Sequence, residues 1–139
     1  MILLPNVPTV PEMVRRARPR WNRVRNGRFT DNRIWSYGAG WSAGVMQAVR
    51  TATGAQSTVS QSVDLVVGAT YRLTFTMTRS AGALTPRFEG GTNVLGTQRP
   101  VGGTHTDTMV AVTGNNVLSF NANATFAGTL SNVWLERIA

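Results

Sequence analysis

The clearest pattern along the chain is an alternation of apolar and polar residues from Thr70 to Arg79. The apolar residues occupy every second position, which places them together on one face of a β-strand. They are Tyr71, Leu73, Phe75 and Met77. Burial is worth roughly 1.5–3 kcal/mol for each large apolar side chain, so we expect this strand to lie in the interior of a sheet.

Weaker period-two patterns occur before and after this strand. Residues 59–65 alternate before it, and residues 104–113 and 117–122 alternate after it, with Gly- and Asn-containing turns between them. A last strand is expected at about 129–138, where the apolar positions break strict alternation and indicate a β-bulge. Short strands without a helical run predict an all-β, antiparallel two-sheet jelly roll or β-sandwich.

The first 25 residues differ from the rest of the chain. Four of the six prolines fall at positions 5, 8, 11 and 19. Proline fixes φ and removes a backbone donor, so we expect an extended start and a brief helix between Pro11 and Pro19. A segment of this kind cannot bury a core by itself. We therefore divide the chain into an extended N-terminal docking arm, residues 1–25, and a β-sandwich, residues 26–139.

The positive charge is concentrated in this arm and just after it. The net charge of +8 comes from 14 basic residues, all of them arginine, and six acidic ones. Residues 1–33 contain eight arginines and two acids, which gives +6, and residues 34–139 contain six arginines and four acids, which gives +2. Arginine forms bidentate contacts with carboxylates and phosphates, although a GC-rich genome also explains the absence of lysine.

Several functional classes are disfavoured by composition. The chain has no cysteine, so disulfides and thiolate metal sites are absent. Residues 1–4 are apolar, but Pro5, Pro8 and Pro11 end the run far short of the apolar region of a signal peptide. No run approaches the ~20 apolar residues of a membrane span. We expect no cofactor, no bound metal and no membrane partner.

Five phrases of the sequence resemble a known family. They match, in order, an NG-x-F opening, a W-x-x-G-x-GW stretch, a central strand, a Gly-Pro element and a closing strand. The matching segments are Asn26–Phe29, Trp35–Ser42, Gly68–Thr76, Gly82–Gly91 and Phe126–Leu135. Together they resemble carbohydrate-binding-module-like, galactose-binding-type jelly-roll domains of tailed-phage virion proteins. Ser131 stands where relatives often carry Asp, and the arm lies outside the resemblance.

A literal G-x-S-x-G at residues 40–44, followed by Asp64 and His105, raises a hydrolase hypothesis. A nucleophile elbow needs a strand before the serine, a helix after it and a large α/β sheet, none of which this sequence predicts. We therefore expect no catalytic residue. His105 and Asp107 share one strand face, but two ligands do not make a metal site. Calcium held by backbone carbonyls and one acid stays open.

Three aromatic residues, Trp35, Tyr37 and Trp41, fall within seven positions. Aromatic faces stack on sugar rings, so these residues could form a glycan platform. The alternative is hydrophobic packing at one end of the sandwich, because the resembled motif keeps both tryptophans.

The arm supplies the second group of candidates. The expected partner-docking residues are Arg15, Arg16, Arg18, Arg20, Trp21, Arg23 and Arg25. Arginine forks and an aromatic anchor suit an acidic protein surface. Phosphate contacts with Trp21 stacking would suit nucleic acid, which we rank below docking, and a simple solvated tail is the third interpretation.

The combined hypothesis is a non-enzymatic structural protein of a phage virion. We expect capsid decoration or cementing, in which the arm binds the major capsid protein or another virion protein, and a homo-oligomer, a trimer by lattice logic. The alternatives are a glycan-binding adhesin module on a phage tail or head appendage, and an Arg-arm nucleic-acid binder inside the particle.

Overall fold

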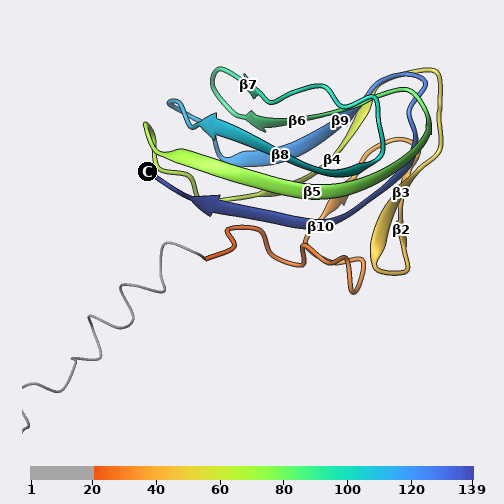
Figure 1. The fold of residues 1–139 in the computed structure, drawn as a ribbon, viewed down its shortest axis with the longest axis horizontal. Helices are drawn as coiled ribbons and strands as arrows, with labels where there is room; N and C mark the ends of the chain where they lie inside the picture. The colour runs from red at the N-terminus through yellow and green to blue at the C-terminus, as the bar shows by residue number, and fades with distance from the viewer. Residues whose placement is uncertain (1–20) are drawn as a thin grey trace, which may run out of the picture.

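The computed structural model describes residues 21–139, which contain ten strands and no helix. The strands form two antiparallel five-stranded sheets that pack around one core (Figure 1). In order of hydrogen-bonded neighbours, the first sheet contains β1 (Ser36–Tyr37), β4 (Ser57–Ser62), β9 (Val117–Ala122), β6 (Leu84–Glu89) and β7 (Val94–Leu95). The second contains β2 (Trp41–Gly44), β3 (Gln47–Arg50), β10 (Ala127–Arg137), β5 (Thr70–Ala81) and β8 (Gly103–Val110). The predicted two-sheet β-sandwich is confirmed. The extended start and the brief helix expected before Pro19 lie outside the described residues.

Strand β5 follows its predicted pattern closely. Tyr71, Leu73, Phe75 and Met77 are all buried, while the intervening residues are more exposed. The strand pairs with β10 on one side and β8 on the other, so it is interior, as its apolar face predicts. The period-two signal was reliable here because one face of β5 meets the other sheet along most of its length.

The predicted bulge is present in β10. The pairing of β10 with β5 shifts register between Ser131 and Trp134, and Asn132 in the bulge has a φ of +51°. Asn tolerates this left-handed conformation better than most residues. After the bulge, Val133 and Leu135 face the core, and Trp134 is left on the outer surface. The bulge therefore decides which side of the sheet carries the tryptophan.

Strand β6 was missed because its sequence contains Pro86. Proline lacks the N–H that a central strand needs on both sides. The Pro86 carbonyl accepts a hydrogen bond from Gly96 N at 2.8 Å, on the β7 side of the strand. The missing donor therefore faces β7, whose pairing with β6 covers only two residues, Val94 and Leu95. The strand keeps its full register with β9.

Residues 21–28, here called the N-terminal segment, run along β10 beyond the end of β3 (Figure 1). Arg23 N donates to the Leu135 carbonyl at 2.6 Å, and Val133 N donates to the Gly27 carbonyl at 2.9 Å. The side chain of Val24 is buried in the core. These contacts attach residues 22–25 to the sandwich, although the expected division at residue 25 counted them with the arm.

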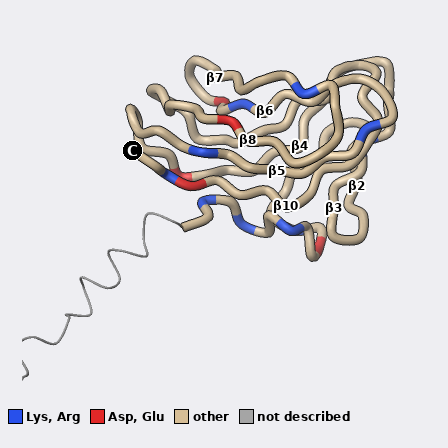
Figure 2. The backbone as a smooth tube through the Cα atoms, in the orientation of Figure 1, with Lys and Arg blue, Asp and Glu red and all other residues tan. Residues whose placement is uncertain are grey.

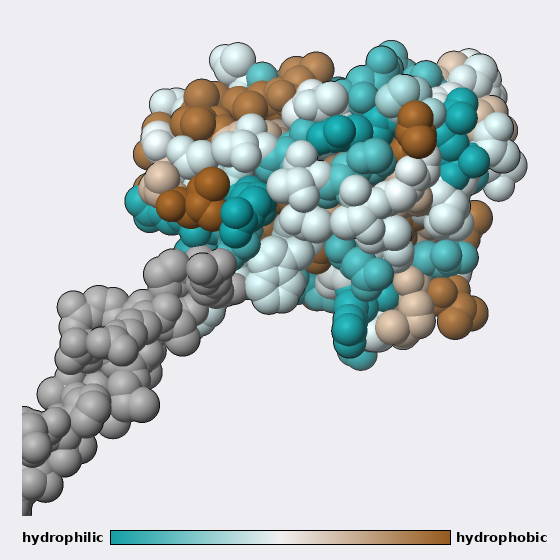
Figure 3. Space-filling model, in the orientation of Figure 1, coloured by the Kyte–Doolittle hydropathy of each residue, from teal (hydrophilic) through white to brown (hydrophobic). Residues whose placement is uncertain are grey.

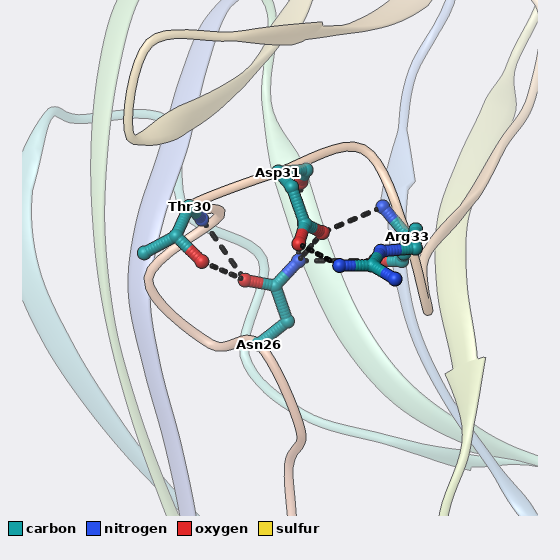
Figure 4. A network of polar contacts seen from close by, with 4 residues as sticks. All are labelled: Asn26, Thr30, Asp31 and Arg33. Carbon is teal, nitrogen blue, oxygen red and sulfur yellow. Dashed lines mark hydrogen bonds and ion pairs between the residues drawn. The ribbon is translucent and has the colours of Figure 1, made fainter.

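The loop after this segment is held by the side chain of Asn26 (Figure 4). Its Oδ1 accepts from the backbone N–H and hydroxyl of Thr30 at 2.9 and 3.0 Å. Its Nδ2 donates to the carbonyls of Asp31 and Arg33 at 3.1 and 3.0 Å. Asn26 itself has a φ of +51°. The NG-x-F opening therefore encodes a self-clamped loop, and its Phe29 is buried beneath it.

The outer surface is mostly hydrophilic or neutral on the face that Figure 3 shows, and brown side chains gather near the C-terminal end. Val66, Val67, Val110 and Ile138 are exposed around the start of β5. Within residues 21–139, no helix is long and apolar enough to cross a bilayer.

Candidate functional site

The two tryptophans of the expected glycan platform are buried. Trp35 is 5% exposed and stacks on Phe29 with ring centroids 4.7 Å apart, and Trp41 is 6% exposed. Both indole N–H groups donate to backbone carbonyls, that of Trp35 to Asn26 at 2.8 Å. Neither ring offers a face to a ligand, so the packing interpretation holds for these residues.

Tyr37 also points into the sandwich. It lies on β1 opposite Val59, which is fully buried, and its hydroxyl has no hydrogen-bond partner. Burial, with a smaller contribution from the negative charge of Asp31, raises the pKa of Tyr37 above its usual value of 10.0. The phenol is therefore held neutral, as a packing group with an unsatisfied hydroxyl.

The G-x-S-x-G residues do not form a nucleophile elbow. Ser42 lies on β2, which turns directly into β3 as a hairpin instead of a helix. His105 lies on β8, at the opposite edge of the same sheet, four strand spacings away. Neighbouring strands are about 4.8 Å apart, so the serine and the histidine are separated by roughly 19 Å. The Ser-Asp-His hypothesis does not have the required geometry.

His105 and Asp107 do face the same side of β8, but each has a structural partner. Asp107 accepts from Arg99 at 2.6 Å, and a ring nitrogen of His105 lies 2.7 Å from the Val101 carbonyl. The segment around Arg99 is thereby fastened to the edge strand. Among the described residues, no group of three or more potential ligands is placed to hold a metal ion.

The exposed tryptophans are Trp21, at 53%, and Trp134, at 43%. The first belongs to the expected docking residues, whereas Trp134 was not among the candidates. The signal for it was available, since a bulge between inward Leu130 and inward Val133 leaves the next residue facing outward. Each of the two rings borders a surface hollow beside the N-terminal segment.

The Trp21 hollow has a volume of about 470 Å³. Its lining comes from two parts of the chain, the N-terminal segment and the residues that follow β4. The lining residues are Trp21, Arg23, Arg25, Ser62, Val63 and Asp64. The structure therefore brings Trp21, Arg23 and Arg25 of the docking set together, and adds Ser62 and Asp64, which sequence reasoning did not connect with them.

Gln61 fixes the relation between these two parts. Arg25 N donates to Gln61 Oε1 at 3.0 Å, and Gln61 Nε2 donates to the Arg25 carbonyl at 2.9 Å. Gln61 is buried on β4, directly before Ser62. The hollow is therefore built on backbone that is tied to the first sheet through Gln61 and to β10 through Arg23.

The charged side chains of the Trp21 hollow form no ion pair within residues 21–139. In the part of the chain that the structure describes, neither Arg23 nor Arg25 has a carboxylate partner, and the Nε of Arg23 is buried without a hydrogen-bond partner. Asp64 likewise pairs with no arginine among residues 21–139. The other four carboxylates of residues 21–139 each hold an arginine at 2.6–3.2 Å. Figure 2 shows basic positions along the N-terminal segment, below β10.

The hollow beside Trp134 is smaller, about 370 Å³, and its polar lining is largely committed to the fold. Asn22 donates to the Val133 carbonyl at 3.2 Å and accepts from Val24 N and Leu135 N. Asn132 belongs to the bulge. Arg28 is the remaining charged group there. The Trp21 hollow is therefore the stronger candidate for a ligand.

The outer face of the second sheet is a third surface of interest. Threonines on β5 face threonines on β8 and β10, and their hydroxyls bond to one another. The pairs are Thr74–Thr106 at 3.4 Å, Thr76–Thr104 at 2.9 Å and Thr78–Thr129 at 2.7 Å. Hydroxyls that pair within the sheet have less capacity left for a ligand.

The remaining docking residues of the expected arm, Arg15, Arg16, Arg18 and Arg20, lie outside the described residues. Their proposed role stays a prediction.

No protein-family model matches the chain. No curated protein matches its sequence. Solved structures do match its fold.

Two of these structures are carbohydrate-binding modules. TmCBM61, solved in complex with β-1,4-galactotriose, has a TM-score of 0.61 and 15% identity, with 85% of this chain and 99% of that module covered. The N-terminal cellulose-binding domain of Cellulomonas fimi β-1,4-glucanase C has a TM-score of 0.58 and 18% identity, with 86% and 99% covered. The fold is a carbohydrate-binding-module-like jelly roll.

A third match comes from a phage. It is the enzymatically active domain of tailspike protein 4 of bacteriophage CBA120, with a TM-score of 0.62 and 19% identity. The match covers 84% of this chain but only 21% of the tailspike chain. This jelly roll therefore corresponds to about a fifth of that solved chain, and at such identities the likeness establishes the fold alone.

Proposed function

We propose that this jelly roll is a non-catalytic glycan-binding module of a phage particle and that its ligand occupies the Trp21 hollow. The observation that carries the proposal is the composition of that hollow. An exposed indole lies beside a serine, two arginines and an aspartate, and the three charged groups form no ion pair within residues 21–139.

This composition suits the chemistry of a sugar ring. The ring presents an apolar C–H face that can lie against an aromatic plane, and a rim of hydroxyls that both donate and accept hydrogen bonds. Arginine donates to hydroxyl oxygens, and a carboxylate accepts from hydroxyl hydrogens. Ligand pockets generally combine one apolar surface with a few placed polar groups, and the volume of about 470 Å³ lies in their usual range.

The fold comparisons support the proposal at a coarser level. Two of the similar structures are named as carbohydrate-binding modules, and the third belongs to a phage tailspike. The tailspike match includes an enzymatically active domain, but this chain matches only 21% of it. A binding module is also consistent with the absence of a Ser-His arrangement between Ser42 and His105.

A glycan array followed by calorimetric titration tests the function. The full chain should bind at least one glycan, and Trp21→Ala should weaken binding by about tenfold or more, as expected for loss of a central aromatic anchor. Trp134→Ala is the matched control, since it removes the other exposed indole and should leave affinity within about twofold. Binding that depends on Trp134 instead of Trp21 would show that the ligand site is the hollow beside Trp134. If no glycan binds, the proposed function is refuted.

A second candidate is docking on an acidic surface of a virion protein, including the capsid decoration role. The observation in its favour is that Arg23, Arg25 and Arg28 follow one another on the N-terminal segment and have no carboxylate partner in the described chain. It predicts that the wild-type protein copurifies with virions and that variants in which these arginines are substituted do not. A trimeric assembly and a place in the virion belong to this proposal.

A further inference from the structure

We infer that the Trp21 hollow selects a sugar that carries an anionic group, a carboxylate or a phosphate, over a neutral sugar. The inference rests on the proposed glycan-binding function and names the class of ligand. Three observations on the arginines of residues 21–139 lead to it.

The first observation is the use that the fold makes of its arginines. Arg33, Arg72, Arg87 and Arg99 each pair with a carboxylate. Arg50, Arg79 and Arg137 donate to backbone carbonyls. Arg23, Arg25 and Arg28 do neither. All three unpaired guanidinium groups lie on the N-terminal segment, and two of them line the same hollow.

The second observation is the buried donor of Arg23. Its Nε is shielded from solvent and has no acceptor in the described chain. A charged donor that is removed from water without an acceptor is unfavourable, so such a group needs an explanation. The Nε of Arg99 is also unpaired, but that guanidinium already contacts Asp107 at 2.6 Å. Arg23 forms no ion pair with any carboxylate of residues 21–139.

The third observation is the charge balance of the lining. Two guanidinium groups and one carboxylate, Asp64, give the hollow a net charge of +1. Guanidinium presents parallel N–H donors that match the two oxygens of a carboxylate or phosphate. An anionic sugar would pair with the guanidinium groups of the lining and balance the charge, while Trp21 takes the ring face and Asp64 accepts from hydroxyls.

The test compares matched charged and neutral glycans on the full chain. The probes are an oligogalacturonate, its methyl ester with the same rings and no charge, a phosphorylated mannan and the unphosphorylated mannan. These join a glycan array that contains further uronate, phosphate and neutral structures. Inorganic phosphate is the probe for an anion site that does not need a sugar.

The variants separate the hollow from general basicity. Arg23→Gln and Arg25→Gln remove one charge each from the lining, whereas Arg79→Gln removes one charge at the far end of β5. We expect acidic glycans to bind at least about tenfold more tightly than their neutral counterparts, with the preference lost in the first two variants and kept in the third. The affinities for the oligogalacturonate and for the phosphorylated mannan show which anionic group is preferred.

Each other outcome overturns the inference. If neutral glycans bind as well as acidic ones and still require Trp21, the anionic class is wrong and the glycan-binding function stands. If Arg79→Gln weakens acidic binding as much as Arg23→Gln, the preference is general basicity. If inorganic phosphate competes as strongly as an acidic sugar, the hollow is an anion site only. If no glycan binds, the proposed function falls with it.

Discussion

The side-chain amide of Gln61 and the backbone of Arg25 exchange two hydrogen bonds, at 3.0 and 2.9 Å, across the border between the two sheets. Gln61 comes from β4, and the next residues along the chain, Ser62 to Asp64, form one wall of the Trp21 hollow. The opposite wall begins with Arg25 and Arg23. The buried amide of Gln61 therefore holds the two walls of the candidate site in position relative to each other.

Gln61→Leu should destabilise the protein by about 1–3 kcal/mol, because it leaves the N–H and carbonyl of Arg25 without their partner. It should also speed hydrogen exchange at the Arg25 amide more than at the β5 amides. Denaturant unfolding and exchange monitored by NMR measure the two effects. Gln98→Leu, at an exposed position, is the control and should change stability by less than about 0.5 kcal/mol. Equal stability of the two variants would show that the amide bridge is dispensable.

Truncation should locate the start of the folded body. Removing residues 1–25 takes away Val24 from the core and the hydrogen bond from Arg23 N to the Leu135 carbonyl, whereas removing residues 1–20 leaves both. We expect the longer deletion to be less stable than the shorter one by at least about 2 kcal/mol, roughly the value of one buried valine and its backbone bonds. Thermal unfolding of the two truncated proteins compares them. Equal stability would mean that residues 21–25 contribute nothing to the sandwich.

Tyr37→Phe should leave stability unchanged or raise it by up to about 1 kcal/mol. The hydroxyl of Tyr37 is buried without a partner, so the substitution removes an unsatisfied polar group and keeps the ring. The pKa of Tyr37 is raised by burial above 10.0, so the unfolded state loses its proton first and the wild type should lose stability as the pH rises above 10.0. Tyr37→Phe should lack this alkaline decline. A clear destabilisation at neutral pH would show that the hydroxyl is bonded in solution.

The loop clamped by Asn26 should respond to acid through Asp31. A hydrogen bond from Arg33 N lowers the pKa of Asp31 below 3.8, and the ion pair with Arg33 acts in the same direction. Because the folded pKa is lower, the unfolded state binds the proton first, and the contribution of Asp31 to stability is present above pH 3.8 and lost as the pH falls through the folded value. The stability difference between wild type and Asp31→Asn should therefore shrink on acidification. A difference that is independent of pH would contradict this.

The sandwich was predictable because its strands carry their own signals. Apolar and polar residues alternate strictly from Tyr71 to Met77, and the break in this alternation near Val133 predicted the bulge. Strand β6 gave no such signal, because a proline argues against a central strand. Pro86 is tolerated because its missing N–H faces β7, which pairs with β6 over only two residues. Tertiary context, not local propensity, decides such positions.

The candidate site was predictable only in part for a related reason. Trp21, Arg23 and Arg25 stand out in the sequence, but Ser62 and Asp64 lie some 40 residues away, and the bonds of Gln61 to the Arg25 backbone bring the two parts together. Trp35 and Trp41 look like a platform by their spacing alone, whereas alternation and loop geometry turn both rings inward. Sequence spacing shows which aromatic residues are close, and the packing decides which of them face solvent.

The most direct measurement is an NMR titration of the full chain, isotopically labelled, with the best-binding glycan from the array. The account predicts that the indole N–H of Trp21, the side chain of Arg23 and the amides of residues 62–64 shift with a common saturation curve, while the Trp134 indole and the threonines of β5 and β8 stay unchanged. Shifts that centre on Trp134 or on the threonine face, with the Trp21 hollow silent, would contradict it.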